Sequence, residues 1–170
     1  LDFIYFESLP HTSLEARQKV IDLAKILKNF GNNGKLYVVP FTKIQETIYK
    51  EMTSEYMITM MRRMMYRIGE RVAKKYKCNA IVNGESIGQV ASQTLTSIKV
   101  VNDVTNYPII RPLASYDKLE IISIAKQIGS YDISILPYED CCTIFVPPHP
   151  VINPVLDVAK KQEDNFTFTL

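Results

Sequence analysis

Residues Asn83 to Leu95 read N-G-E-S-I-G-Q-V-A-S-Q-T-L and follow the short β-type run Ala80 to Val82. The spacing beyond Gly84 suits a helix, so we expect a strand-to-helix turn here. In an open parallel α/β sheet, ligands bind outside the carboxyl ends of strands, where helix N-termini present unpaired backbone N–H groups. Gly84 and Gly88 carry no Cβ and would let a ligand approach the backbone. The same pattern also fits an ordinary structural turn.

Strands and helices alternate on both sides of this stretch. Strands are expected at Leu1 to Phe6, Leu36 to Val39 and Tyr107 to Leu113, and helices after Thr12 or Ser13, over Thr42 to Met52 and Ser54 to Tyr76, and after Asp117. Leu36 to Val39 is continuously apolar, as expected of a strand covered on both faces. The alternation predicts an α/β fold with a doubly wound, Rossmann-like parallel sheet.

Composition narrows the class of protein. A chain of 170 residues with 46% hydrophobic and 22% charged residues is globular and suits one domain. Its net charge of +2 means that any nucleic-acid contact must come from a local patch. No run reaches the roughly 18 apolar residues of a membrane span, and Leu1 to Phe6 lacks the basic flank of a signal peptide. We therefore expect a soluble, cytoplasmic protein with no membrane partner.

The expected long helix from Ser54 to Tyr76 has two distinct faces. An apolar stripe contains Met57, Met61, Met64, Met65, Ile68 and Val72, which we expect in the core. Basic residues share another face at helical spacing, namely Arg63, Arg67, Arg71 and Lys74. This face is a candidate RNA-binding surface, and a solvated charged face is the alternative.

Three cysteines, Cys78, Cys141 and Cys142, form neither a disulfide framework nor a C-x-x-C metal motif, so no metal site is predicted. Adjacent Cα atoms are about 3.8 Å apart, which would strain a bridge between Cys141 and Cys142. The pair lies in a proline-rich loop, where a reactive thiol would be accessible. The neighbouring Glu139 and Asp140 disfavour a thiolate, so a chemical role and a resting thiol both stay open.

Two further basic residues lie near the ends of an expected strand and an expected helix. Arg111 follows Ile110 in the expected strand, and Lys118 follows the helix cap Asp117. Arginine suits phosphate or carboxylate through its fork of donors, and lysine suits phosphate as a point charge. An ordinary salt bridge is the alternative for each.

The order of these motifs resembles a known family. N-G-E-S-I-G-Q-V-A-S-Q-T-L is followed by I-I-R-P-L-x-x-x-D-K-x-E-I-I-x-I-A-x-x-I-G and a cysteine loop. Y-F-E-S-L-P-H-T-S near the start and M-R-R-M-M-Y-R in the long helix match as well. Together they resemble the catalytic domain of the tRNA 4-thiouridine synthetases (tRNA sulfurtransferases), which are PP-loop ATP pyrophosphatases of the adenine nucleotide alpha hydrolase type. The resemblance covers nearly the whole chain.

The resemblance implies a two-step reaction. The family uses ATP and Mg²⁺ to adenylate the uridine at the eighth tRNA position and releases pyrophosphate. Sulfur delivered as a persulfide by a cysteine desulfurase then replaces the activated oxygen and expels AMP. Some members also supply sulfur for thiamine synthesis.

The resemblance also assigns residues. Tyr5, Phe6, Arg62, Gly84 and Gln93 fall on the nucleotide-contacting positions. An aromatic side chain and strand-end backbone suit adenine, and a cation suits the phosphates.

Lys118 falls on the functional lysine of the family's D-K motif, where it would stabilise charge that develops during adenylation. The sulfur-carrying cysteine falls on Cys141 or Cys142. The spacing from Lys118 favours Cys141, but the doubled residue leaves the choice open.

One departure from the family pattern is large. The family's phosphate loop, S-G-G-x-D-S, occurs nowhere in this sequence. The family's N-terminal RNA-binding region and the rhodanese-like extension of some members have no counterpart either. We therefore expect residues 1–170 to form the C-terminal part of a single PP-loop domain whose sheet is incomplete at its N-terminal strand. Alone, this part should not turn over ATP.

Two other functions remain as alternatives. One is a non-catalytic module that binds tRNA or a protein partner through the basic face of the long helix. The other is a different ATP pyrophosphatase of the same architecture that acts on a small substrate. The sequence leaves open whether the protein forms a homodimer and whether it takes part in thiamine synthesis.

Overall fold

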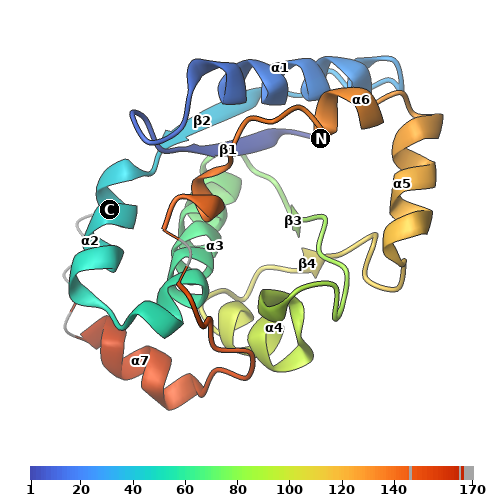
Figure 1. The fold of residues 1–170 in the computed structure, drawn as a ribbon. Coiled ribbons are helices and arrows are strands. Elements are labelled where there is room, and N and C mark those ends of the chain that lie inside the picture. Colours follow the sequence, from blue (N-terminus) through green and yellow to red (C-terminus); the bar gives the residue numbers. More distant parts are fainter. Residues whose placement is uncertain (146, 165, 167–170) are drawn as a thin grey trace. The chain divides into compact units, whose positions relative to one another are not determined.

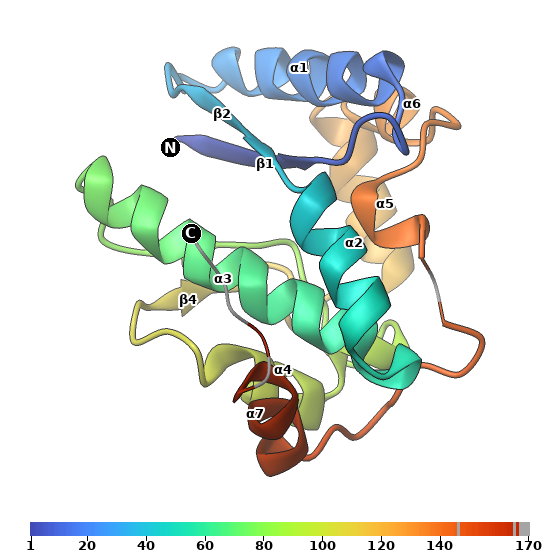
Figure 2. The same cartoon turned by 90° about the vertical axis from the view of Figure 1, so that its left-hand side faces the viewer.

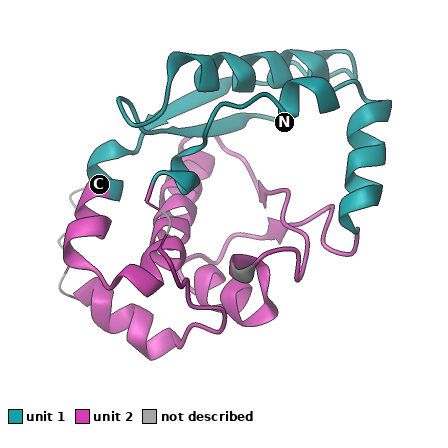
Figure 3. Cartoon of the chain, viewed as in Figure 1, with its two compact units in different colours: residues 1–45, 117–144 teal, residues 46–116, 145–170 magenta. Residues whose placement is uncertain are grey.

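The structure is a computed structural model that describes residues 1–145, 147–164 and 166. The chain divides into two compact units (Figure 3). The first unit contains Leu1–Gln45 and Asp117–Ile144, and the second contains Glu46–Tyr116 and Phe145–Leu170.

The first unit is built on two parallel strands. It contains β1 (Phe3–Glu7), α1 (Leu14–Lys28), β2 (Leu36–Pro40), the start of α2 (Thr42–Glu51), α5 (Lys118–Gln127), α6 (Tyr131–Ser134) and the 3-10 turn η3 (Cys141–Thr143). β1 and β2 pair in parallel with Tyr5 opposite Val38, and α1 lies along this pair (Figure 1, Figure 2). The Ser13 side chain caps α1 by accepting the backbone N–H of Ala16, which confirms the expected start of this helix.

Gly34 allows the two strands to begin close together. A Cβ on this residue would lie 1.6 Å from the carbonyl oxygen of Leu1. Phe3 donates its backbone N–H to the Lys35 carbonyl at 2.7 Å, which fixes the same approach. Only glycine fits this position without a backbone shift.

The second unit contains the remaining elements and a second parallel pair. These are η1 (Ser54–Tyr56), α3 (Met57–Lys75), β3 (Ile81–Val82), η2 (Ala91–Gln93), α4 (Leu95–Asn102), β4 (Ile109–Ile110) and α7 (Leu156–Asp164). β3 pairs in parallel with β4, with Ile81 opposite Ile109. The predicted α/β class with parallel strands is confirmed, and the described strands form two two-stranded sheets.

The methionine stripe of α3 forms much of the core of the second unit. Met57, Met61, Met64 and Ile68 are buried as predicted, whereas Met65 and Val72 are half-buried. Met60, which the sequence did not single out, is also buried. The apolar face of α3 is therefore wider than the predicted stripe.

Helix α5 begins as predicted and is only partly buried. Asp117 and Glu120 form a capping box at its N-terminus. Its isoleucines and Ala125 are half-buried, and Leu119 is 76% exposed.

No helix in the described part of the chain is both long and apolar enough to span a bilayer.

Candidate functional site

The stretch that follows β3 is a loop for most of its length, which corrects the expected helix start. After the loop, η2 covers Ala91–Gln93, and α4 begins only at Leu95. The helix begins there because the Thr94 hydroxyl accepts the backbone N–H of Ser97 at 3.1 Å. Gln93 therefore lies in a 3-10 turn ahead of α4, and no helix begins at Gly84.

Gly84 and Gln93 have the features expected of a ligand-binding loop. A Cβ on Gly84 would meet only Leu113 Cδ1, at 4.0 Å, so packing does not require glycine here and the backbone stays accessible. The Gln93 Oε1 atom is buried and has no hydrogen-bond partner among the described residues. A buried acceptor without a donor costs free energy, which a ligand N–H would recover.

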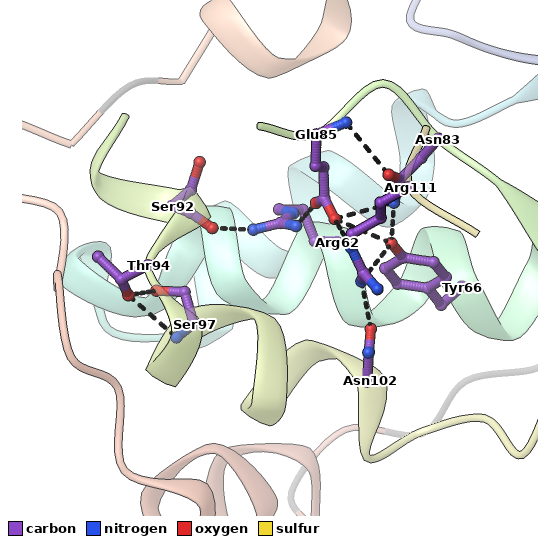
Figure 4. A network of polar contacts seen from close by, with 9 residues as sticks. All are labelled: Arg62, Tyr66, Asn83, Glu85, Ser92, Thr94, Ser97, Asn102 and Arg111. Atoms are coloured by element: carbon purple, nitrogen blue, oxygen red, sulfur yellow. Dashed lines mark hydrogen bonds and ion pairs between the residues drawn. The ribbon is translucent and has the colours of Figure 1, made fainter. Parts of the chain in front are cut away.

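Arg62 reaches this loop from α3. Its guanidinium donates to the Ser92 carbonyl and forms an ion pair with Glu85 (Figure 4). Arg111 donates its Nε–H to Glu85 Oε2 at 2.7 Å, so the salt-bridge interpretation of Arg111 is confirmed. The structure thus brings Arg62 to the loop that carries Gly84 and Gln93.

Tyr5 lies on β1 in the first unit and is 8% exposed. Burial raises the pKa of its phenol, and interactions with the nearby Glu7, Asp140 and Cys141 raise it further. The hydroxyl therefore stays protonated at neutral pH. Because Asp140 and Cys141 contribute to this shift, Tyr5 and the cysteine loop are electrostatic neighbours within one unit.

The two adjacent cysteines differ in exposure. Cys141 is 6% exposed and Cys142 is exposed, with their Sγ atoms 3.9 Å apart. Neither forms a disulfide. The hydrogen bond with Cys142, burial, and the charges of Cys142 and Asp140 all raise the pKa of the Cys141 thiol. Cys141 is therefore a protonated thiol at neutral pH, and Cys142 is the more accessible sulfur.

Two buried polar side chains hold the cysteine loop. Gln45 donates through Nε2 to the Cys141 carbonyl, and the Ser8 hydroxyl donates to Gln45 Oε1 at 2.7 Å. Both Gln45 and Ser8 are fully buried. Neither residue was predicted from the sequence, although one signal was present: Gln45 is three residues before Ile48 and seven before Met52, so helical spacing places it on the apolar face of α2.

Lys118 and Phe6 complete the predicted residues of the first unit. Lys118 is the exposed first residue of α5. Phe6 is half-buried and packs edge-on against Phe41, with ring centroids 5.4 Å apart. Of the predicted site residues, the first unit holds Tyr5, Phe6, Lys118, Cys141 and Cys142, and the second holds Arg62, Gly84 and Gln93.

The basic residues of α3 do not share one exposed face. Arg63 is 1% exposed and donates two hydrogen bonds to the Glu163 carboxylate, at 2.8 and 2.7 Å. Arg67 donates two more to the same carboxylate. The prediction of an exposed Arg63 is therefore wrong, because an ion pair with α7 buries it. Arg71 and Lys74 are exposed near the C-terminal end of α3.

These features define an α/β protein with parallel strands and a candidate nucleotide loop that follows a strand. The chain matches the family model described as "Thiamine biosynthesis protein (ThiI)" over residues 1–168. It belongs to the ThiI family.

Two relatives extend this assignment. The chain is 55% identical over 164 residues to a probable tRNA sulfurtransferase of Halothermothrix orenii, covering 96% of this chain and 41% of the relative. It also matches the crystal structure of a 4-thiouridine synthetase–RNA complex with bound ATP at a TM-score of 0.91 and 41% identity. That match covers 96% of this chain and 43% of the solved chain. The chain thus spans about two fifths of the length of both relatives.

Proposed function

We propose that this chain is part of an enzyme that thiolates tRNA, forming 4-thiouridine at position 8 in an ATP-dependent reaction. The observation that carries this proposal is the match over 96% of the chain to a 4-thiouridine synthetase whose structure holds RNA and ATP. The 55% identity to a probable tRNA sulfurtransferase supports the same function.

In this proposal five residues contact ATP, namely Tyr5, Phe6, Arg62, Gly84 and Gln93. Gln93 offers a buried acceptor for an N–H donor such as the adenine amino group, and Gly84 leaves the backbone open beside it. Arg62 supplies positive charge for the phosphates, while Tyr5 and Phe6 provide aromatic surface and strand-end backbone. ATP supplies the adenylyl group that activates the uridine oxygen.

The second step is sulfur transfer through the cysteine pair. A cysteine desulfurase transfers sulfur to Cys141 or Cys142 as a persulfide. The terminal sulfur attacks the activated uridine and expels AMP, which leaves the cysteine joined to the uridine by an S–S bond. A second thiol then attacks the cysteine sulfur of that bond, which releases 4-thiouridine and forms a disulfide that a thiol reductant reduces. The exposure of Cys142 favours it as the site that meets the donor protein, whereas Cys141 is buried and interacts electrostatically with Tyr5. Lys118 stabilises the negative charge that develops during adenylation.

For the RNA contact we retain Arg67, Arg71 and Lys74 and leave out Arg63, which is buried. Lys74 pairs with Glu70 at 2.5 Å, but its side chain remains 61% exposed. Phosphate contacts from these residues should make tRNA binding salt-dependent.

The described residues contain no cluster of three or more His, Cys, Asp or Glu side chains that could hold a metal ion. In this proposal Mg²⁺ accompanies ATP, as in the family that the sequence resembles.

Sulfur delivery for thiamine synthesis is a second candidate function, favoured by the description of the matching family. It would use the same cysteine pair. A strain that carries the Cys141→Ser, Cys142→Ser double variant should then lack 4-thiouridine in its tRNA. It should also need added thiamine to grow.

The test uses the complete protein with Cys141→Ser, Cys142→Ser and the double variant. We expect the variant of the sulfur carrier to lose 4-thiouridine formation and to retain tRNA-dependent pyrophosphate release. Full thiolation by both single variants and by the double variant would refute the sulfur-transfer role.

Two further measurements separate the alternatives. Pyrophosphate release that does not require tRNA would favour an ATP pyrophosphatase with a small substrate. The Arg71→Glu variant tests the RNA contact. If it binds tRNA more weakly and with less salt dependence but still thiolates normally, Arg71 serves RNA binding alone. Binding of tRNA without any ATP consumption by the complete protein would favour a non-catalytic module.

A further inference from the structure

Glu85 lies between two arginines in the second unit (Figure 4). Arg62 reaches it from α3, and Arg111 reaches it from the residue after β4. All three side chains are largely buried: 12% of each arginine side chain and 11% of Glu85 is exposed. Charge-assisted hydrogen bonds of this kind are strong and directional, so Glu85 fixes the position of both guanidiniums.

The two carboxylate oxygens of Glu85 have different partners. Oε1 pairs with Arg62. Oε2 accepts from Arg111 Nε at 2.7 Å, from Asn83 Nδ2 at 2.9 Å and from the Tyr66 hydroxyl at 3.4 Å. The Oε2 side therefore has three donors and the Oε1 side has the Arg62 guanidinium.

Arg111 has anchors that do not depend on Glu85. Its Nη2 donates to Asn102 Oδ1 at 2.7 Å and to the Tyr66 hydroxyl at 3.3 Å (Figure 4). The Arg62 guanidinium pairs with Glu85 and donates to the Ser92 carbonyl of the candidate nucleotide loop.

We propose that Glu85 is a positioning residue that holds the Arg62 guanidinium in place for an adenine nucleotide. Arg111, Asn83 and Tyr66 bind the other oxygen of Glu85 and keep the carboxylate from rotating. The inference rests on the proposed function, because it takes Arg62 as a nucleotide contact. It assigns Glu85 an effect on nucleotide affinity through Arg62, without contact between Glu85 and the nucleotide.

The geometry predicts what Glu85→Gln does. The new amide has one oxygen and one NH₂ group, and the NH₂ group cannot accept a hydrogen bond. If it took the Oε2 position, it would face donors from Arg111, Asn83 and Tyr66. It therefore takes the Oε1 position, where it faces Arg62. Glu85→Gln should therefore remove the ion pair that orients Arg62 and leave the Arg111 contact in place.

The experiment is a double-mutant cycle on ATP affinity, measured by equilibrium binding to the complete protein. The variants are Glu85→Gln, Arg62→Ala and Arg111→Ala, with each double variant that contains Glu85→Gln. Glu51→Gln, an exposed carboxylate of the same unit, is the matched control.

We expect Glu85→Gln and Arg62→Ala each to weaken ATP binding by roughly tenfold or more, the scale of one charge-assisted hydrogen bond. Adding Arg62→Ala to Glu85→Gln should then cost less than about threefold. Arg111→Ala acts on Arg62 through Glu85, so its effect on ATP affinity should also shrink in the Glu85→Gln background. Glu51→Gln should bind ATP as the wild type does.

The inference is overturned if the effects of Glu85→Gln and Arg62→Ala multiply, or if Glu85→Gln binds ATP within about twofold of wild type. A purely structural role would lower the melting temperature without this coupling to Arg62. If Glu85→Gln does not fold, Glu85→Asp takes its place in the cycle, because it withdraws the carboxylate from Arg62 and keeps the charge. If the wild-type protein itself does not bind ATP, the proposed function is wrong, and that result differs from ATP binding by the wild type with independent effects of Glu85 and Arg62.

Discussion

The buried ion pair between α3 and α7 allows a quantitative prediction. Glu163 receives two hydrogen bonds from Arg63 and two from Arg67. Burial alone would raise the pKa of this carboxyl, but the hydrogen bonds and charges of both arginines outweigh burial and lower the pKa from 4.5 to about 2. We predict that Glu163→Gln destabilises the second unit, because it leaves the buried Arg63 without its carboxylate.

The magnitude follows from the pKa. One pKa unit corresponds to about 1.4 kcal/mol, so the lowering of the Glu163 pKa represents about 3 kcal/mol of stabilisation. Removing one partner of a buried ion pair costs about 3–5 kcal/mol in general, which agrees. The folded-state pKa lies below the unfolded value, so this stabilisation is complete above pH 4.5 and is lost as the pH falls towards about 2.

The assay is hydrogen exchange of α3 and α7 backbone amides in the complete protein, supplemented by urea unfolding at several pH values. At neutral pH, Glu163→Gln should raise the exchange rates by about 100-fold. The difference in unfolding free energy between wild type and variant should shrink as the pH is lowered from about 6 to about 3.

Asp103→Asn is the matched control. Asp103 lies 3.6 Å from Arg63 and is 28% exposed, so its loss should cost less than about 1 kcal/mol. Equal effects of the two variants, or a Glu163→Gln effect that does not change with pH, would refute this account of the ion pair.

Two further predictions concern the first unit: the pairing of its two strands and the reactivity of its two cysteines. Gly34→Ala should destabilise the pairing of β1 and β2, because its Cβ would lie 1.6 Å from the Leu1 carbonyl oxygen, and faster amide exchange in both strands would show this. Gly69→Ala is the control: its Cβ would meet only a flexible Ile81 atom at 3.5 Å, so the variant should be neutral or up to about 1 kcal/mol more stable. Iodoacetamide should modify Cys142 faster than Cys141, because Cys142 is exposed whereas burial and neighbouring groups raise the pKa of Cys141. Peptide mass spectrometry would locate the label, and faster modification of Cys141 would contradict the burial of its thiol.

Local features were predictable because short stretches of sequence encode them. Ser13 and Asp117 cap α1 and α5 as expected, since an N-cap depends on residues within one helical turn. The parallel strands and the buried methionines of α3 follow from hydrophobic spacing. The helix start after β3 was misplaced because Thr94, and not the glycine turn, provides the cap.

The sequence by itself thus determined the α/β class, the parallel pairing and, through its motifs, the family. Only the tertiary structure distinguished side chains of the same type. Arg63 is buried because Glu163, 100 residues away, pairs with it, whereas Arg71 eight residues later is exposed. Cys141 is buried and Cys142 is exposed, and Gln45, 96 residues before Cys141, holds this loop through the Cys141 carbonyl. The positioning role proposed for Glu85 likewise depends on partners from α3 and from the residue after β4. Such contacts depend on how distant segments pack, which hydrophobic periodicity and local spacing do not specify.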